Sequence, residues 1–233
     1  IVGKGNGEMF IASDVTAIIE YTREYYLLEP GEVADITADG VTFYDMHKNV
    51  IEKEIQIADW DVSAAEKGGY AHFMLKEICE QPDALKKTIN PRIKNGMPDF
   101  SECGLTDEKL RSYHHIYIVG CGSAMHAGMV GKYVIEKLAR TPVVVDIASE
   151  FRYRDPLLAP DLVVIISQSG ETADTLAALK LANSIGADTL AIVNVVGSSI
   201  AREAKMVMYT LAGPEISVCS TKAYMVQTAF MYL

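Results

Sequence analysis

The sequence has few cysteines, and their spacing excludes two common kinds of site. Among 233 residues only Cys79, Cys103, Cys121 and Cys219 are cysteine, and no two of them form a C-x-x-C pair. Zinc sites and dithiol redox motifs need such closely spaced thiols. We therefore expect no metal and no redox cofactor, and we expect reduced thiols in a cytoplasmic protein.

Long apolar runs and an excess of positive charge are missing as well. No stretch approaches the roughly 18 uninterrupted apolar residues of a membrane span, and the first residues carry no signal-peptide pattern. The chain has 21 Lys and Arg against 31 Asp and Glu, a formal net charge of -10. Nucleic acids and anionic membranes are bound through clustered basic residues, so we expect neither as a partner.

The chain divides into three regions by pattern. Residues 1–60 contain short alternating segments at 25–28, 33–37 and 41–44, separated by turn-forming EPGE and ADG, which predicts small antiparallel sheets. Residues 61–69, DVSAAEKGG, are small and polar, as in a linker. Residues 70–89 have a helical pattern, and we expect Pro82 to split this helix in two.

The third region, residues 70–233, alternates strands with helices. Apolar runs predict strands at 115–119, 142–146, 161–166, 189–193 and 206–211, and helical patterns occupy 124–138, 171–185, 198–204 and the end from about residue 220. This order predicts an α/β fold with a doubly wound parallel sheet. Ligands of such sheets lie beyond the carboxyl ends of the strands, so the loops at 120–124, 167–172, 194–199 and 213–221 should share one edge.

The most informative motif is SQSGETADT, residues 167–175, which follows a buried strand and opens a helix. Ser167, Ser169 and Thr172 offer hydroxyls, Gln168 offers an amide, and Gly170 allows close approach of the backbone. A helix start favours anions through its free N–H groups and its dipole. The motif therefore predicts a phosphate-binding loop.

Ordinary helix capping is the alternative interpretation of this motif. Ser and Thr often cap helices, and Glu171 would then be an acid of the first helical turn. Three hydroxyls and a glycine within six positions favour the ligand. We expect Glu171 to point away from a bound phosphate, because it would otherwise repel it.

Several segments together carry a family resemblance. SQSGETADT is similar to the phosphosugar loop of sugar isomerase (SIS) domains. The whole chain resembles the glucosamine-6-phosphate synthases, the isomerising glutamine:fructose-6-phosphate aminotransferases. The segments that carry this second resemblance are HFMLKEICEQP at 72–82, VGCGSA at 119–124, ASEFRYRD at 148–155 and STKAY at 220–224.

The resemblance implies a domain organisation and a reaction. Residues 1–60 would be the C-terminal part of an N-terminal-nucleophile glutaminase domain, and 70–233 would be a truncated first SIS domain of flavodoxin-like fold. The family makes glucosamine 6-phosphate from fructose 6-phosphate and glutamine without a cofactor. Its catalytic groups would lie before Ile1 and beyond Leu233, so we expect binding without turnover in this fragment and assign no catalytic residue. A homodimer through SIS domains is also implied.

The same resemblance implies site residues. Ser167, Gln168, Ser169 and Thr172 would hold the phosphate of the sugar. Two further loops would contact the sugar itself. Ala124 replaces a hydroxyl residue that is common in the family, so only its backbone could serve there. The residues implied in these two loops are Gly122, Ser123, Ala124, Val218 and Ser220.

Three other side chains have more than one interpretation. Cys121 is expected to be a structural thiol, because no base is evident beside it. His126 is expected to pack on an apolar face and not to reach the sugar. Lys222 stays open between a ligand for phosphate, an imine former and a surface lysine.

Two other functions fit parts of the pattern. A non-catalytic SIS module could bind a phosphosugar and regulate a partner, but the acidic charge and the strands before the SIS region disfavour a DNA-reading regulator. A flavin mononucleotide site could use the S-x-S-G-x-T pattern, but the segments near Ser167 offer no aromatic walls. The amino-sugar enzyme is the leading hypothesis.

Overall fold

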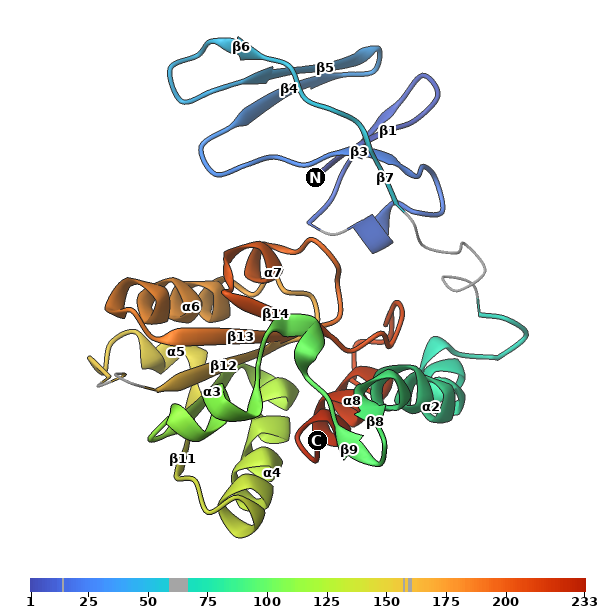
Figure 1. The fold of residues 1–233 in the computed structure, drawn as a ribbon. Helices are drawn as coiled ribbons and strands as arrows, with labels where there is room; N and C mark the ends of the chain where they lie inside the picture. Colours follow the sequence, from blue (N-terminus) through green and yellow to red (C-terminus); the bar gives the residue numbers. More distant parts are fainter. Residues whose placement is uncertain (14, 59–66, 157, 159–160) are drawn as a thin grey trace. The chain divides into compact units, whose positions relative to one another are not determined.

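The computed structural model describes residues 1–13, 15–58, 67–156, 158 and 161–233. The chain forms two compact units, Ile1–Phe73 and Met74–Leu233 (Figure 1). Most of the predicted linker, 61–69, lies outside the described residues. The assignment of the first unit to a glutaminase domain stays a prediction.

The first unit consists of two small antiparallel sheets. One has the order β2-β1-β3-β7 and the other β4-β5-β6. In the second sheet Thr37 pairs with Gly40, which confirms a hairpin around ADG, and the two turn residues are Ala38 and Asp39. The strands are β1 (Val2–Lys4), β2 (Met9–Ile11), β3 (Glu24–Tyr26), β4 (Val33–Thr37), β5 (Gly40–Tyr44), β6 (Val50–Ile51) and β7 (Gln56–Ile57), with a 3-10 turn η1 (Val15–Ala17).

The second unit is built on a five-stranded parallel sheet in the order β11-β10-β12-β13-β14. This order confirms the predicted doubly wound α/β fold. All six residues of β12 are buried, which is typical of a strand covered on both faces. The strands are β10 (Ile116–Gly120), β11 (Val143–Ile147), β12 (Leu162–Ser167), β13 (Asp188–Val193) and β14 (Met206–Tyr209).

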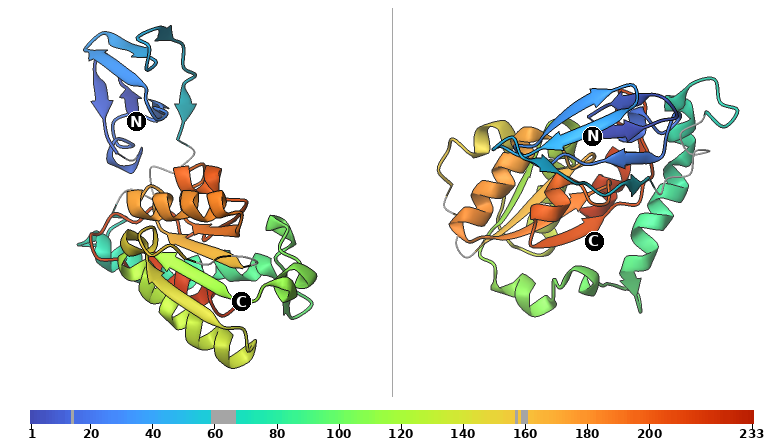
Figure 2. Two further views of the ribbon diagram at one scale, coloured as in Figure 1. Left: turned by 90° about the vertical axis from the view of Figure 1, so that its left-hand side faces the viewer. Right: turned by 90° about the horizontal axis from the view of Figure 1, so that it is seen from above.

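Helices cover both faces of this sheet (Figure 1 and Figure 2). One apolar core lies under α3 (Asp107–Ser112), α4 (Gly122–Leu138) and α8 (Lys222–Phe230), and Ile118 and Val164 belong to it. The other core contains their chain neighbours Val119 and Ile165 and lies under α5 (Ala148–Phe151), α6 (Ala173–Ile185) and α7 (Ser199–Glu203). Successive strand residues thus alternate between the two cores, because the side chains of a strand point to opposite faces.

The remaining elements of this unit precede the sheet. They are α2 (Phe73–Ile89), the 3-10 turns η2 (Asn90–Arg92) and η3 (Ser101–Cys103), and the hairpin of β8 (Ile93–Lys94) with β9 (Met97–Pro98). The guanidinium of Arg92 is buried and donates to the carbonyls of Thr88, at 2.6 Å, and Tyr209, at 2.8 Å. This arginine fixes the end of α2 to the end of β14.

The prediction that Pro82 splits the helix is wrong. α2 runs for 17 residues through Pro82. A proline inside a helix removes one backbone hydrogen bond and costs about 3 kcal/mol. Tertiary contacts on both sides of Pro82 offset this cost: Glu80 pairs with Lys222 at 2.7 Å, and the hydroxyl of Thr88 donates to the carbonyl of Thr210.

Candidate functional site

The predicted phosphate loop lies where β12 ends and α6 begins. Ser167 is the last residue of β12, and its hydroxyl accepts a hydrogen bond from the Gly170 amide at 3.0 Å. The hydroxyl of Ser169 accepts one from the Glu171 amide at 3.2 Å. These two bonds curl the backbone around its own side chains and define the shape of the loop.

Gly170 is required by the geometry of this loop. Its φ is +69°, a conformation that L side chains rarely adopt. A Cβ added there would lie 2.5 Å from Cβ of Ser198 and would overlap the Ser198 hydroxyl. The Gly170 carbonyl also accepts from the Ile200 amide at 3.0 Å. The loop is therefore packed directly on the start of α7.

Glu171 points away from the loop, as expected, but its predicted place in the first turn of the helix is wrong. α6 begins at Ala173, with Thr172 as its N-cap. The carboxylate of Glu171 accepts from the Ser199 amide at 2.8 Å, at the start of α7. An anion is favourable there because the start of a helix carries partial positive charge and the Ser199 amide needs an acceptor.

The start of α6 has the properties of an anion site. The Thr172 side chain makes no capping hydrogen bond, so the capping interpretation does not account for it. In the described part of the chain, no partner is found for the amides of Ala173 and Asp174. Free N–H groups and the helix dipole together stabilise negative charge at such a position.

A cavity of about 210 Å³ opens at this helix start. Its lining contains hydroxyl, amide, thiol and apolar groups and no charged side chain. A phosphate dianion held there would be stabilised by dipoles and hydrogen bonds and not by a salt bridge. The lining residues are Cys121, Ser123, Ala124, Ile166, Ser167, Gln168, Ser169, Thr172, Thr175 and Gln227.

The structure brings together most of the predicted site residues, but not all of them. Gly122 is exposed at the start of α4, and Val218 and Ser220 border a second cavity of about 570 Å³. Ser123 lines both cavities. Gly122 lines neither cavity, and the rest of the predicted set is divided between the two cavities, which share Ser123. The binding role of each residue stays a prediction.

Asn194 fixes the phosphate loop to the neighbouring strand end. Its backbone amide donates to the Gln168 carbonyl at 3.1 Å. Its side-chain oxygen accepts from the Thr210 hydroxyl at 3.1 Å and the Ala212 amide at 2.8 Å, and its side-chain nitrogen donates to the Gly213 carbonyl at 2.8 Å. This buried side chain uses three of its possible hydrogen bonds to hold two loops of the sheet edge in register.

Two carboxylates organise the loop at 213–221. Glu77 of α2 is 2% exposed and accepts from the amides of Ile216, at 2.7 Å, and Ser217, at 2.9 Å. It also accepts from the hydroxyls of Ser217 and Thr221. Glu215 accepts from the amides of Thr221, at 2.8 Å, and Ala223, at 3.0 Å. The position of Val218 and Ser220 therefore depends on these acids.

The interpretation of Lys222 as a surface lysine is wrong, and its two other interpretations stay predictions. Lys222 is 3% exposed, so it is no surface lysine, and its ammonium pairs with Glu80 at 2.7 Å. It lines neither cavity. Its role in this structure is to connect the start of α8 to α2.

The outcomes for Cys121 and His126 differ. Cys121 is half-buried, and its sulfur accepts from the Thr175 hydroxyl at 3.7 Å, as a structural thiol would. His126 is exposed on α4 and lines the second cavity, so the expectation that it packs on an apolar face is wrong. Its position four residues after Gly122 places it on the exposed side of the helix.

Four residues that line the first cavity are missing from the predicted set, and two of them, Thr175 and Gln227, are buried polar residues. Thr175 is 1% exposed on the first turn of α6, and Gln227 is 2% exposed on α8. The motif itself includes Thr175, so the helical spacing of three from Thr172 could have indicated it. No local pattern marks Gln227, because its place depends on how α8 packs on the rest of the unit.

The described residues contain no group of three or more His, Cys, Asp or Glu side chains that could hold a metal ion. Within them, none of the helices combines the length and the apolar character that crossing a bilayer requires.

Comparisons with known proteins decide the family. Residues 109–233, more than half of the chain, match the family model of the SIS domain. The chain belongs to the SIS domain family. This SIS domain chain is 55% identical, over its whole length, to the isomerizing glutamine–fructose-6-phosphate aminotransferase of Clostridium acetobutylicum, and spans 39% of that relative. The corresponding protein of Caldanaerobacter subterraneus is 56% identical with the same coverage.

Solved structures agree with the SIS assignment. The C-terminal domain of the glucosamine-fructose-6-phosphate aminotransferase of Francisella tularensis is 44% identical, with a TM-score of 0.67, over 71% of this chain and 47% of that chain. Glucosamine-6-phosphate deaminase of Thermotoga maritima is 21% identical, with a TM-score of 0.56, over 69% of this chain and 47% of that chain. The second similarity concerns the fold alone.

Proposed function

We propose that this chain is the phosphosugar-binding part of an isomerising glutamine:fructose-6-phosphate aminotransferase. The observation that carries the proposal is the uncharged cavity of hydroxyls and amides at the start of α6. Similarity to aminotransferases extends over the whole chain, including the first 73 residues, which favours the enzyme over a regulatory SIS module.

In this proposal the phosphate of fructose 6-phosphate lies at the start of α6. The hydroxyls of Ser169 and Thr172 donate to its oxygens, and the amides of the first helical turn supply further donors. The sugar extends past Ser123 into the second cavity, which Val218 and Ser220 border. All the predicted site residues except Gly122 then line the first or the second cavity.

The proposed reaction of the whole protein transfers the amide nitrogen of glutamine, as ammonia, to C2 of fructose 6-phosphate. The resulting imine isomerises to glucosamine 6-phosphate by a proton shift between C1 and C2, which requires an acid–base group matched to that task. We assign no residue of this chain to that step, and we expect the chain to bind the sugar phosphate without turnover. The protein would work in the cytoplasm in amino-sugar biosynthesis.

A homodimer through the SIS domain is part of the proposal. The outer face of α4 presents large apolar side chains four residues apart, with Met129 41% and Tyr133 71% exposed. Residues at this spacing form one stripe on a helix. Such a stripe is typical of a helix that packs against another subunit.

Calorimetry with the isolated chain tests the site. We expect fructose 6-phosphate to bind, fructose not to bind, and the double variant S169A/T172V to lose most of the affinity, because each missing hydroxyl removes a charge-assisted hydrogen bond. Equal affinity of the variant and the wild-type chain would contradict the site. A folded wild-type chain that binds no sugar phosphate would contradict the proposed function.

A further inference from the structure

Gln227 is a buried polar residue of the cavity that does not belong to the phosphate loop. It lies on α8, whereas the loop joins β12 to α6, and it is 2% exposed. Its side chain lines the same cavity as Ser169 and Thr172. Among the described residues, no hydrogen bond of this side chain is found, and the fully enclosed unpaired polar atoms are those of Ser198 and Thr228, so the Gln227 amide reaches the cavity.

A buried amide without a partner is unfavourable. Most buried polar side chains in proteins are hydrogen-bonded. A polar side chain without hydrogen bonds destabilises the fold more than an apolar side chain of the same shape would at that position. An apolar residue would therefore suit this position better if the cavity had only to be filled. The amide makes sense where an oxygen-rich ligand completes its hydrogen bonds.

The two other buried polar side chains of the cavity each make one hydrogen bond already. The Thr175 hydroxyl donates to the sulfur of Cys121, and the Ser167 hydroxyl accepts from the Gly170 amide. Gln227 brings two uncommitted N–H donors and one acceptor to the cavity. Among the buried polar side chains of the cavity, it thus offers the most uncommitted hydrogen-bonding groups to an added molecule.

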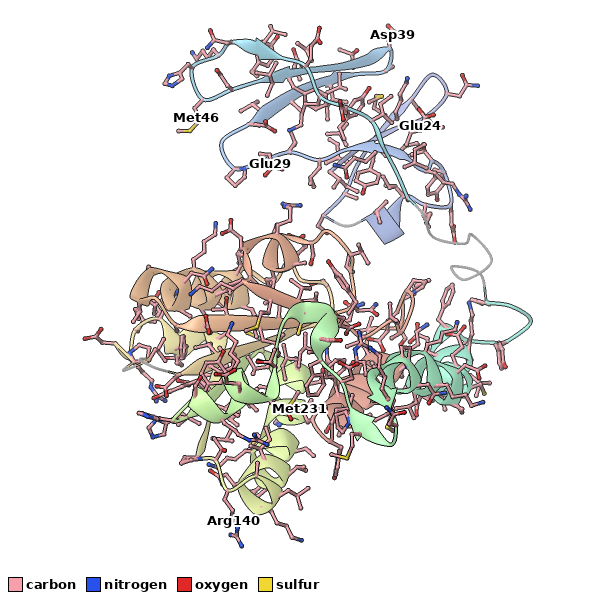
Figure 3. All side chains as sticks on the ribbon, viewed as in Figure 1. Glu24, Glu29, Asp39, Met46, Arg140 and Met231 are labelled. Atoms are coloured by element: carbon pink, nitrogen blue, oxygen red, sulfur yellow. The ribbon has the colours of Figure 1, made fainter. Side chains whose placement is uncertain are left out.

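The packing of α8 fixes the position of this amide. α8 lies against α4 at Gly131, where an added Cβ would come within 2.6 Å of the sulfur of Met231, which Figure 3 labels. The other end of α8 is held by Glu215, through the Ala223 amide, and by Glu80, through Lys222. A helix anchored at both ends holds Gln227 in place before any ligand binds.

We propose that the side-chain amide of Gln227 binds the phosphate group of the ligand. It donates an N–H to a phosphate oxygen from α8, so that residues of three elements, β12, α6 and α8, bind the anion together. This inference rests on the proposed function and adds a binding residue to it. Because the amide is neutral, a carboxylate of the same size at this position would repel the anion.

A matched pair of variants tests the inference. Q227L removes the amide, and T228V removes the hydroxyl of the next residue, which is also buried and without a partner but does not line the cavity. Each change removes from α8 a polar group that makes no hydrogen bond within the described residues, so we expect both variants to unfold at temperatures close to that of the wild-type chain. Calorimetry with fructose 6-phosphate should show about 10-fold weaker binding for Q227L, the equivalent of one hydrogen bond, and unchanged binding for T228V.

Two further variants keep the test decisive. Q227M has an unbranched side chain of similar length and replaces Q227L if leucine disturbs the fold. We expect Q227M to show the same loss of affinity for fructose 6-phosphate. Q227E should bind inorganic phosphate less well than Q227L at neutral pH, and its affinity relative to wild type should recover as the pH falls and the carboxyl group is protonated.

The outcomes separate this inference from the function on which it rests. Wild-type affinity in folded Q227L or Q227M overturns the role of Gln227 and leaves the proposed function standing. A folded wild-type chain that binds neither fructose 6-phosphate nor inorganic phosphate overturns both. An equal loss in T228V and Q227L also overturns the inference, because it would show a general effect of α8.

Discussion

Glu77 offers a sharp test of how the loop at 213–221 is held. Its carboxylate is 2% exposed and accepts from two backbone amides, those of Ile216 and Ser217, and from the Thr221 hydroxyl at 2.8 Å. The Ser217 hydroxyl is a fourth donor. E77A removes the acceptor of all four donors, whereas E77Q keeps one amide oxygen of the same shape.

The expected magnitude follows from these bonds. An unsatisfied buried donor costs about 1–3 kcal/mol, and hydrogen bonds to a charged group contribute about 1.5–3 kcal/mol. Water can replace part of the loss, because Ile216 is exposed at the loop surface. We therefore expect E77A to lower the free energy of unfolding by about 3 kcal/mol, and E77Q by about half as much.

The stability should also depend on pH through this residue. Burial raises the pKa of Glu77, but the hydrogen bonds from Ser217, Ile216 and Thr221 together outweigh burial and hold that pKa below its usual value of 4.5. The ionised carboxylate therefore stabilises the folded chain fully above about pH 4.5, and this contribution disappears as the pH falls through the lowered pKa. E77Q should lose less stability than the wild-type chain over that acidic range.

Urea unfolding of wild type, E77Q and E77A at pH 7, followed by a series of acidic buffers, measures these quantities. The control is Glu8, an exposed acid of the first unit, whose alanine variant should leave the stability of the second unit unchanged. An E77A variant whose unfolding free energy lies within about 0.5 kcal/mol of the wild-type value would refute the reasoning, because surface changes commonly have effects of that size.

The remaining predictions concern the loop supports and the sheet. G170A should lower the unfolding free energy by roughly 3 kcal/mol and abolish phosphate binding, because it adds a clash with Ser198 to the strain of a positive φ. G186A should cost only about 1 kcal/mol, because its added Cβ meets nothing within 4 Å. Equal costs of the two variants in urea unfolding would contradict this. N194A should lower the unfolding free energy by about 2–3 kcal/mol, because the Thr210 hydroxyl and the Ala212 amide lose their acceptor, and it should weaken binding of fructose 6-phosphate in calorimetry. Unchanged binding would show that Asn194 does not position the loop. Y113F should lower the unfolding free energy by about 1 kcal/mol, because it removes the 2.8 Å hydrogen bond to Asp188, and it should leave sugar binding unchanged. A loss of sugar affinity would show that this hydrogen bond affects the site.

The sheet and the loop were predictable because their signals are local. The apolar runs that end at Val119 and Ile166 are strands that need cover on both faces, and each run ends within one residue of the observed strand. The hydroxyls after Ile166 then had to lie at the carboxyl edge of the sheet. Pattern alone therefore located the cavity that Ser167, Ser169 and Thr172 line.

The rest depends on contacts between distant segments. Pro82 remains inside a helix because Glu80 and Thr88 are fixed to residues more than 100 positions away in the chain. Lys222 is buried for the same reason, since its partner lies on α2. Gln227 reaches the cavity because α8 packs closely on α4. The sequence pattern of α8 alone does not predict this packing.

The central claim is that main-chain amides and hydroxyls at the start of α6 bind the phosphate group of a sugar. A crystal structure of the chain with saturating fructose 6-phosphate tests this claim most directly. The account predicts the phosphate in the cavity, with its oxygens in hydrogen-bond contact with the hydroxyls of Ser169 and Thr172 and the first-turn amides of α6. A well-ordered sugar phosphate bound at another place, with this cavity holding only solvent, would contradict it.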